Sequence, residues 1–272
     1  MAPLRLSLRL TAFTLFLGAT AVLAATLLAT DTLTRRSIDR TPWARRCFRW
    51  ACRCLGLHIQ VHGTPCPDPV LFVSNHISWT DIPVLGSQAP MLFLSKAEVG
   101  DWPLIGWLAR QAGTLFIKRG GGRARRVRQT IAERLADDES VLVFPEGTTS
   151  QGLRVLPFHG LLLAAAEQSG RPVQAITISY RRDGRPDPIA PFVGDDAFHR
   201  HLFTLLRQPR ARIDVLFHPP EPGDPALGTG ELAARLQARV QAGLTRIQAG
   251  ELDAPPAETI RTVAGPGLSR PR

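Results

Sequence analysis

The chain has 272 residues, of which 44% are hydrophobic, and it carries a formal net charge of +10 at pH 7 with a calculated pI of about 10.9. This length allows one α/β domain with residues left over for an appendage, and the apolar content excludes a disordered chain. The excess of arginine indicates an anionic partner, but nucleic acid is disfavoured because the chain has one tyrosine and no recognisable nucleic-acid-binding motif.

The first predicted element is an uncharged apolar run, Thr11 to Thr30. As a helix it would measure about 30 Å, which matches the hydrocarbon core of a bilayer. Arg5 and Arg9 precede this run and many arginines follow it, so the positive-inside tendency predicts an inner-membrane protein whose remaining chain faces the cytoplasm. The alternative is a cleaved signal peptide ending near Leu23-Ala24-Ala25, which the strongly basic stretch that follows argues against.

A second helix, amphipathic in pattern, is predicted over Thr41 to Leu57. Its apolar residues recur at helical spacing with arginines between them, and they include Trp43 and Trp50. Indoles and arginines suit a helix at the water–lipid boundary. The alternative is a helix packed on the soluble core with a solvated basic face. Residues 1–56 are thus predicted to be membrane-anchoring helices.

From Leu57 onward short apolar strands alternate with helices. Strands are predicted at 57–62, 70–74, 91–95, 114–118, 141–144, 173–180 and 213–217, and helices near 81–87, 103–111, 123–137, 161–168, 196–206 and 231–248. This alternation predicts an α/β fold with a mostly parallel central sheet flanked by helices, preceded by an N-terminal membrane-associated helical pair. The domain is predicted to span residues 57–250, followed by a disordered tail over residues 251–272.

A polar cluster, Ser74 to Asp81, follows the second of these strands. His76 and Asp81 can meet there if the backbone turns sharply, because on an ideal helix their side chains would point about 140° apart. A carboxylate bonded to one ring nitrogen fixes the imidazole tautomer and makes the other nitrogen a better base. The alternative is a histidine that only caps a helix or satisfies a local hydrogen bond.

Two further strands end in polar residues. One delivers Arg119, whose guanidinium can hold a phosphate through two bonds, although it can equally be a surface arginine. The other runs from Val141 into Pro145-Glu146-Gly147-Thr148, where a carboxylate, backbone amides and a hydroxyl enter a loop. The alternative for that segment is a plain turn at the end of a strand.

With these stretches in order, the sequence resembles the membrane glycerolipid acyltransferases, typified by 1-acyl-sn-glycerol-3-phosphate acyltransferase. The first motif of that family, NH-x4-D, matches Asn75, His76 and Asp81. The second matches Phe116, Ile117 and Arg119, the third, FPEGT, matches Phe144 to Thr148, and the fourth is matched loosely by Pro172 to Ile176. The resemblance covers roughly Leu57 to Tyr180.

The resemblance implies transfer of a fatty acyl group from acyl-CoA or acyl carrier protein to the hydroxyl of a lysolipid, 1-acyl-sn-glycerol-3-phosphate above all, to give phosphatidic acid. It implies that His76 is the general base, that Asp81 orients it, and that the substrate is bound by Asn75, Phe116, Arg119, Glu146, Gly147 and Thr148. Because no GxSxG elbow is present, the acceptor is expected to attack directly, with no acyl-enzyme. No metal or other cofactor is expected, and the partners are membrane lipids and the two substrates.

Two positions depart from the family pattern. Thr149 replaces an arginine that many lysophosphatidate enzymes carry after EGT, and Gln174 stands where a proline is common. A different acceptor, such as a lyso-ornithine lipid, is therefore an alternative. A non-catalytic membrane-binding protein is the alternative from another class.

Overall fold

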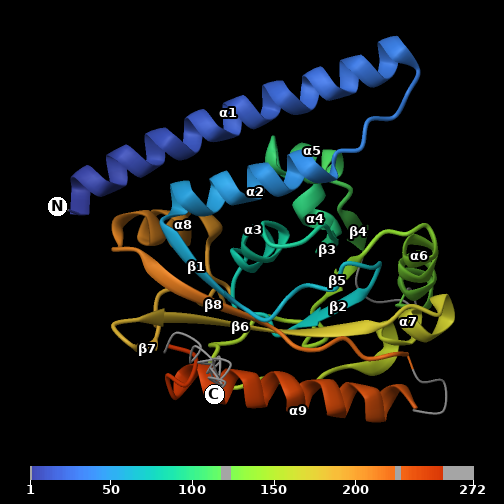
Figure 1. Cartoon of the computed structure of the whole chain (residues 1–272). Helices are drawn as coiled ribbons and strands as arrows, with labels where there is room; N and C mark the ends of the chain where they lie inside the picture. The colour runs from blue at the N-terminus through green and yellow to red at the C-terminus, as the bar shows by residue number, and fades with distance from the viewer. Residues whose placement is uncertain (1, 118–123, 224–227, 254–272) are drawn as a thin grey trace, which may run out of the picture.

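The computed structural model describes residues 2–117, 124–223 and 228–253, and its centre is one twisted sheet (Figure 1). The strand order across the sheet is β1-β8-β6-β2-β5-β3-β4, and a short β7 pairs with β6. The strands are β1 (Leu57–His62), β2 (Leu71–Ser74), β3 (Leu92–Lys96), β4 (Leu115–Ile117), β5 (Val141–Val143), β6 (Val173–Arg182), β7 (Arg185–Pro186) and β8 (Ala211–Phe217).

The predicted mostly parallel sheet is confirmed. The strands from β6 through β2, β5 and β3 to β4 run parallel, whereas β8 pairs antiparallel with β6 and parallel with β1. The central strands are buried on both faces, as their apolar sequences require. In β2, Leu71 and Val73 enter one core cluster and Phe72 enters the other, because alternate side chains of a strand point to opposite faces.

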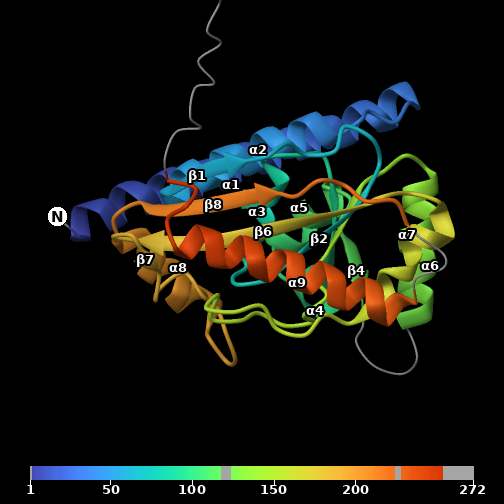
Figure 2. The same cartoon turned by 60° about the horizontal axis from the view of Figure 1, so that its bottom comes forward.

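Helices cover both faces of this sheet (Figures 1 and 2). α6, α7 and α9 supply apolar side chains to the core on one face, and α2 and α3 supply them on the other. The helices are α1 (Ala2–Thr34), α2 (Thr41–Leu55), α3 (Asp81–Gly86), α4 (Ala97–Gly100), α5 (Ile105–Gln111), α6 (Ala124–Ala136), η1 (Gly160–Leu162), α7 (Ala164–Ser169), α8 (Phe198–Arg207) and α9 (Thr229–Gln248).

α1 is longer than the predicted apolar run and lies lengthwise over α2 and α8 (Figure 1). Its length and its mean hydropathy of 2.1 make it a candidate membrane span. Only 6% of its apolar 18-residue segment is buried. Its N-terminal end is tied to the end of α8, since Arg5 and Arg9 donate hydrogen bonds to the carbonyls of Arg207 and Gln208 at 3.0 and 2.8 Å. Guanidinium groups are favourable at a helix C-terminus.

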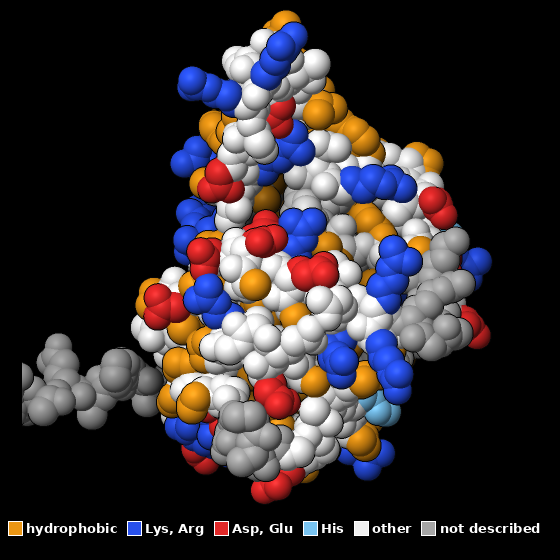
Figure 3. Space-filling view, turned by 90° about the vertical axis from the view of Figure 1, so that its right-hand side faces the viewer, with side chains coloured by type: hydrophobic (Ala, Val, Ile, Leu, Met, Phe, Trp, Pro, Cys, Tyr) orange, Lys and Arg blue, Asp and Glu red, His pale blue; other side chains and the backbone are white. Residues whose placement is uncertain are grey.

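α2 has two different faces. Cys52 and Leu55 are buried in the core, while Trp43 and Trp50 stay exposed with an arginine guanidinium near each ring. The buried face packs on the core, and the contact of the exposed face with lipid stays a prediction. In the end-on view of Figure 3, the end of the molecule where α1 passes into the segment before α2 projects beyond the body, and basic side chains lie there.

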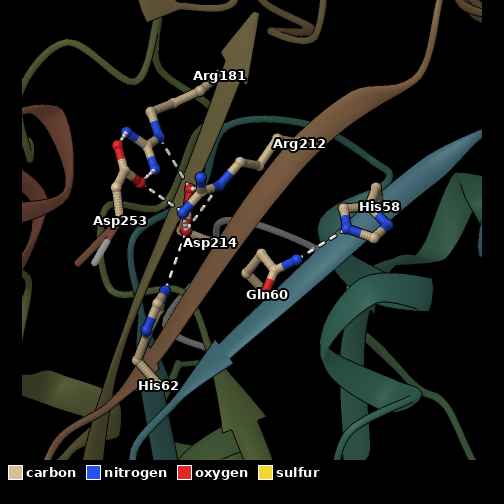
Figure 4. Close-up of polar contacts among 7 residues, drawn as sticks. All are labelled: His58, Gln60, His62, Arg181, Arg212, Asp214 and Asp253. Atoms are coloured by element: carbon tan, nitrogen blue, oxygen red, sulfur yellow. Dashed lines mark hydrogen bonds and ion pairs between the residues drawn. The ribbon is translucent and has the colours of Figure 1, made fainter. Parts of the chain in front are cut away.

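A polar lattice occupies the α9 face of the sheet at β6, β8 and β1 (Figure 4). Asp214 is fully buried and accepts hydrogen bonds from His62, Arg181 and Arg212, and Asp253 pairs with the same two arginines. Asp253 lies three residues past the predicted boundary at residue 250, and it takes part in this polar lattice. The rest of the predicted tail lies outside the described residues.

Candidate active site

His76 and Asp81 meet at the turn between β2 and α3. β2 ends at Ser74 and α3 begins at Asp81, so six residues connect the strand to the helix. His76 Nδ1 lies 2.7 Å from Asp81 Oδ2, and the same oxygen accepts the backbone amides of Ile77 and Ser78 at 2.7 and 3.1 Å. The Asp81 carboxylate therefore stabilises the turn that precedes it and also orients the imidazole of His76.

The arrangement leaves the imidazole ready to accept a proton. The Asp81 side chain is fully buried, whereas that of His76 is 20% exposed. Since an ionised carboxylate only accepts hydrogen bonds, Nδ1 carries the ring proton and Nε2 presents its lone pair. The ring also stacks on Phe144, with centroids 3.9 Å apart and planes at 12°, which fixes its plane.

The loop after β5 holds the His76 backbone from both sides. Glu146 Oε1 accepts the His76 amide at 2.9 Å, and the amide and hydroxyl of Ser150 both donate to the His76 carbonyl, at 2.8 and 3.2 Å. The other Glu146 oxygen accepts the amide of Leu156 at 3.3 Å. The two loops are thus joined at the backbone of His76.

Glu146 is nearly fully buried, at 5% exposure. Burial raises its pKa from an ordinary 4.5 to about 7, and nearby Asp81 adds to the rise, while hydrogen bonds from His76 and Leu156 oppose it. The carboxyl group of Glu146 therefore titrates near neutral pH. It does so while it accepts the backbone amide of His76.

Asn75 joins the turn to β6. Its amide oxygen accepts the Ile178 N–H and its amide nitrogen donates to the Ile178 carbonyl, both at 2.9 Å. This pairing continues the β2–β6 ladder past the last strand residue, and Asn75 is 1% exposed. Its predicted contact with substrate stays a prediction, while its observed contacts hold the loop.

The remaining predicted site residues lie at different distances from the dyad. Gly147 and Thr148 are exposed directly after Glu146, and Gly147 has a φ of +67°, which suits glycine. Phe116 lies on β4, three strands away from β2, or about 14 Å at the usual strand spacing. Arg119 lies outside the described residues. The predicted substrate contacts of these side chains stay predictions.

Two residues at the site were missed at the sequence level. Phe144 belongs to the FPEGT match, but its stacking on His76 has no sequence signal. Tyr180, on β6, donates a hydrogen bond to Asp81 Oδ1 at 2.6 Å. Its one available signal is that it is the single tyrosine of the chain.

The two departures from the family pattern also differ. Thr149 lies in the loop that holds His76, directly before Ser150. Gln174 pairs in register with Phe72. Its side chain accepts the amide of Cys66 and donates to the carbonyls of Thr64 and His218. Only the first departure therefore adjoins the site.

No group of three His, Cys, Asp or Glu side chains with metal-binding geometry occurs within residues 2–117, 124–223 and 228–253. Cys47, Cys52, Cys54 and Cys66 are free thiols. The expectation of an enzyme without a metal or other cofactor stays an expectation.

The structure thus places a histidine–aspartate dyad at the carboxyl end of a parallel strand, in an α/β domain that follows an apolar N-terminal helix long enough to cross a membrane. The model of the acyltransferase family matches residues 58–179. Lyso-ornithine lipid O-acyltransferase from Pseudomonas aeruginosa is 48% identical over 76% of this chain and 81% of that protein. 1-Acyl-sn-glycerol-3-phosphate acyltransferase from Neisseria meningitidis is 34% identical over 60% of this chain and 64% of that protein.

Among solved structures, 1-acyl-sn-glycerophosphate acyltransferase (PlsC) from Thermotoga maritima has the same fold, with a TM-score of 0.60 and 23% identity over 92% of this chain and 98% of that one. The chain belongs to the acyltransferase family, and it is an O-acyltransferase of lipid metabolism. The predictions of the family, the fold class and the type of enzyme are confirmed.

Proposed function

We propose that this enzyme transfers a fatty acyl group from an acyl thioester to the free hydroxyl of a lyso-ornithine lipid, with His76 as general base. The observation that carries this proposal is the 2.7 Å contact between His76 Nδ1 and the buried Asp81 carboxylate. An alcohol is a poor nucleophile until a base shares its proton, and such assistance is worth about 10²–10⁴-fold in rate.

In the proposed reaction, Nε2 of His76 accepts the hydroxyl proton while the oxygen attacks the thioester carbonyl. The tetrahedral intermediate collapses, its C–S bond breaks, and the departing thiolate takes the proton back from the imidazolium. Asp81 keeps its charge throughout and stabilises the imidazolium. The exposed Gly147 and Thr148 adjoin this centre and supply the amide and hydroxyl groups proposed to contact substrate.

Two observations support a lyso-ornithine lipid as acceptor. The Pseudomonas relative that covers 76% of this chain carries that name. Thr149, in the loop that holds His76, is neutral where many lysophosphatidate enzymes carry arginine. An amino-acid head group lacks the phosphate that such an arginine would bind.

The second candidate acceptor is 1-acyl-sn-glycerol-3-phosphate, giving phosphatidic acid. It is favoured by the second motif, which ends in Arg119, since a guanidinium can bind the acceptor phosphate through two bonds. The donor is acyl-CoA or acyl carrier protein. The setting we propose is the inner membrane with the catalytic domain on the cytoplasmic side, supported by α1 and by the exposed Trp43 and Trp50 of α2.

The experiment presents both acceptors to the purified full-length protein in mixed micelles with each donor, and identifies the products by mass spectrometry. We expect the acylated ornithine lipid to dominate and His76→Ala to remove activity in every combination. The Thr149→Arg variant should shift the product ratio towards phosphatidic acid. Full activity in His76→Ala, or no product with any lysolipid, would leave a non-catalytic membrane-binding protein as the better description.

A further inference from the structure

Tyr180 is buried against the catalytic dyad, with 3% exposure. Its hydroxyl lies 2.6 Å from Asp81 Oδ1 and 2.8 Å from the hydroxyl of Thr80. The other carboxylate oxygen, Oδ2, accepts the imidazole of His76 and two backbone amides. The phenol therefore holds the carboxylate oxygen that the histidine does not use.

The direction of this hydrogen bond follows from the chemistry of the groups. An ionised carboxylate can only accept, so the phenol must donate to Asp81, and the Thr80 hydroxyl donates to the phenol oxygen. Burial, and then the neighbouring Asp81 charge, raise the pKa of Tyr180 well above its usual value. The phenol thus keeps its proton throughout the pH range in which histidine titrates.

We propose that Tyr180 is a positioning residue for the dyad: its hydroxyl sets the rotation of the Asp81 carboxylate and shares its negative charge, which controls how strongly that carboxylate supports the His76 imidazolium. This inference rests on the proposed role of His76 as general base. Hydrogen bonds to charged groups are stronger than those between neutral groups, so the contact of Tyr180 with Asp81 affects how well Asp81 stabilises protonated His76.

The end of β6 that carries Tyr180 is fixed from the opposite face of the sheet. The next residue, Arg181, bonds Asp214 through Nε at 2.9 Å and is also paired with Asp253, which in turn lies 2.6 Å from Arg212 (Figure 4). The Tyr180 carbonyl also accepts the amide of Asp187 at 2.9 Å. Because the backbone is held in this way, removing the phenol oxygen leaves the aromatic ring in place.

The test is Tyr180→Phe in the purified full-length enzyme, assayed for acyl transfer with the acceptor and donor that the wild type uses. We expect kcat to fall on the order of 10-fold, because the carboxylate loses the contact that sets its rotation and therefore orients His76 less well. KM should stay unchanged, because no substrate contact is lost. Without the phenol, fewer donors share the carboxylate charge, so Asp81 supports the imidazolium more strongly. The acidic limb of the pH–rate profile should therefore move up by about half to one pH unit.

Two other titratable groups act on this network and must be separated from it: Glu146 on Asp81 and Cys52 on Tyr180. Glu146 exchanges its proton near neutral pH, and burial raises the pKa of the Cys52 thiol to about 12. The comparison is therefore repeated with Glu146→Gln in both proteins, which removes the nearer titration. Thr80→Val, which weakens the phenol as a donor, should move the limb in the same direction by less, and Thr80→Ser should restore the wild-type profile.

Asp253→Asn is the matched control for general loosening of β6, because it weakens the lattice on the opposite face without touching the dyad. It should lower the melting temperature and leave the pH profile unchanged. If Tyr180→Phe folds and keeps both the wild-type kcat and acidic limb, the inference is overturned. If that variant does not fold, Thr80→Val decides in the same way. Full activity in His76→Ala would instead defeat the proposed function itself.

Discussion

Replacing Glu146 with glutamine should remove a pH dependence of stability that the structure itself predicts. Burial raises the pKa of Glu146 from 4.5 to about 7. A rise of that size corresponds to about 3 kcal/mol of preference for the protonated form in the folded state. This contribution is fully present below pH 4.5, the pKa expected in the unfolded chain, and is lost as the pH rises through the folded pKa of about 7.

Glutamine is neutral at every pH, but its amide nitrogen cannot accept a hydrogen bond, so the variant loses one of the two backbone contacts of Glu146 at every pH. This loss is independent of pH. The difference in unfolding free energy between variant and wild type should therefore shift in favour of the variant by up to about 3 kcal/mol between about pH 4 and pH 8. Unfolding in detergent is followed by the fluorescence of the chain's five tryptophans. Because other titrating groups are common to both proteins, they cancel in the difference. A difference that is constant between these pH values would refute the reasoning.

Two further variants test the dyad and its support. Asp81→Asn keeps the size of the side chain but removes the charge that stabilises the imidazolium, so kcat should fall by about 10²–10⁴-fold in single-turnover assays. An undiminished rate would contradict the role of Asp81 as orienting group. Phe144→Leu removes the aromatic ring stacked on His76 and should lower kcat about 5-fold, with KM unchanged, since such stacking is worth about 1 kcal/mol. A change confined to KM would show that Phe144 contacts substrate instead.

Much of the fold follows from local pattern. The strand β5 and its polar end could be predicted because a short apolar run followed by Pro145 and Gly147 cannot continue as a strand or begin as a helix. The turn at Asp81 could also be predicted, since the spacing from His76 does not bring the two side chains together on a helix. The order of the strands had no such signal, because register and neighbours depend on which faces the helices cover.

The burial of the site residues and their hydrogen-bond partners could not be predicted from local sequence pattern. In sequence, Glu146 could hold an arginine, a histidine or a substrate hydroxyl, and the structure shows its carboxylate on the His76 backbone amide. Tyr180 is about a hundred residues from Asp81 along the chain, so only the pairing of β6 beside β2 brings them into contact. The periodicity of α2 predicts an amphipathic helix, but it does not say whether the apolar face contacts protein or lipid.

The sequence by itself determined which residues are candidates for the chemistry: the histidine and aspartate of the NH-x4-D motif, and the apolar helix that precedes the domain. These features depend on residue type and short spacing, which the chain carries in one dimension. The tertiary structure decided how that base is held, through the contacts of His76 with Glu146 and Ser150 and of Asp81 with Tyr180. Those contacts join residues far apart in the chain, and they form only when the sheet sets β2, β5 and β6 side by side.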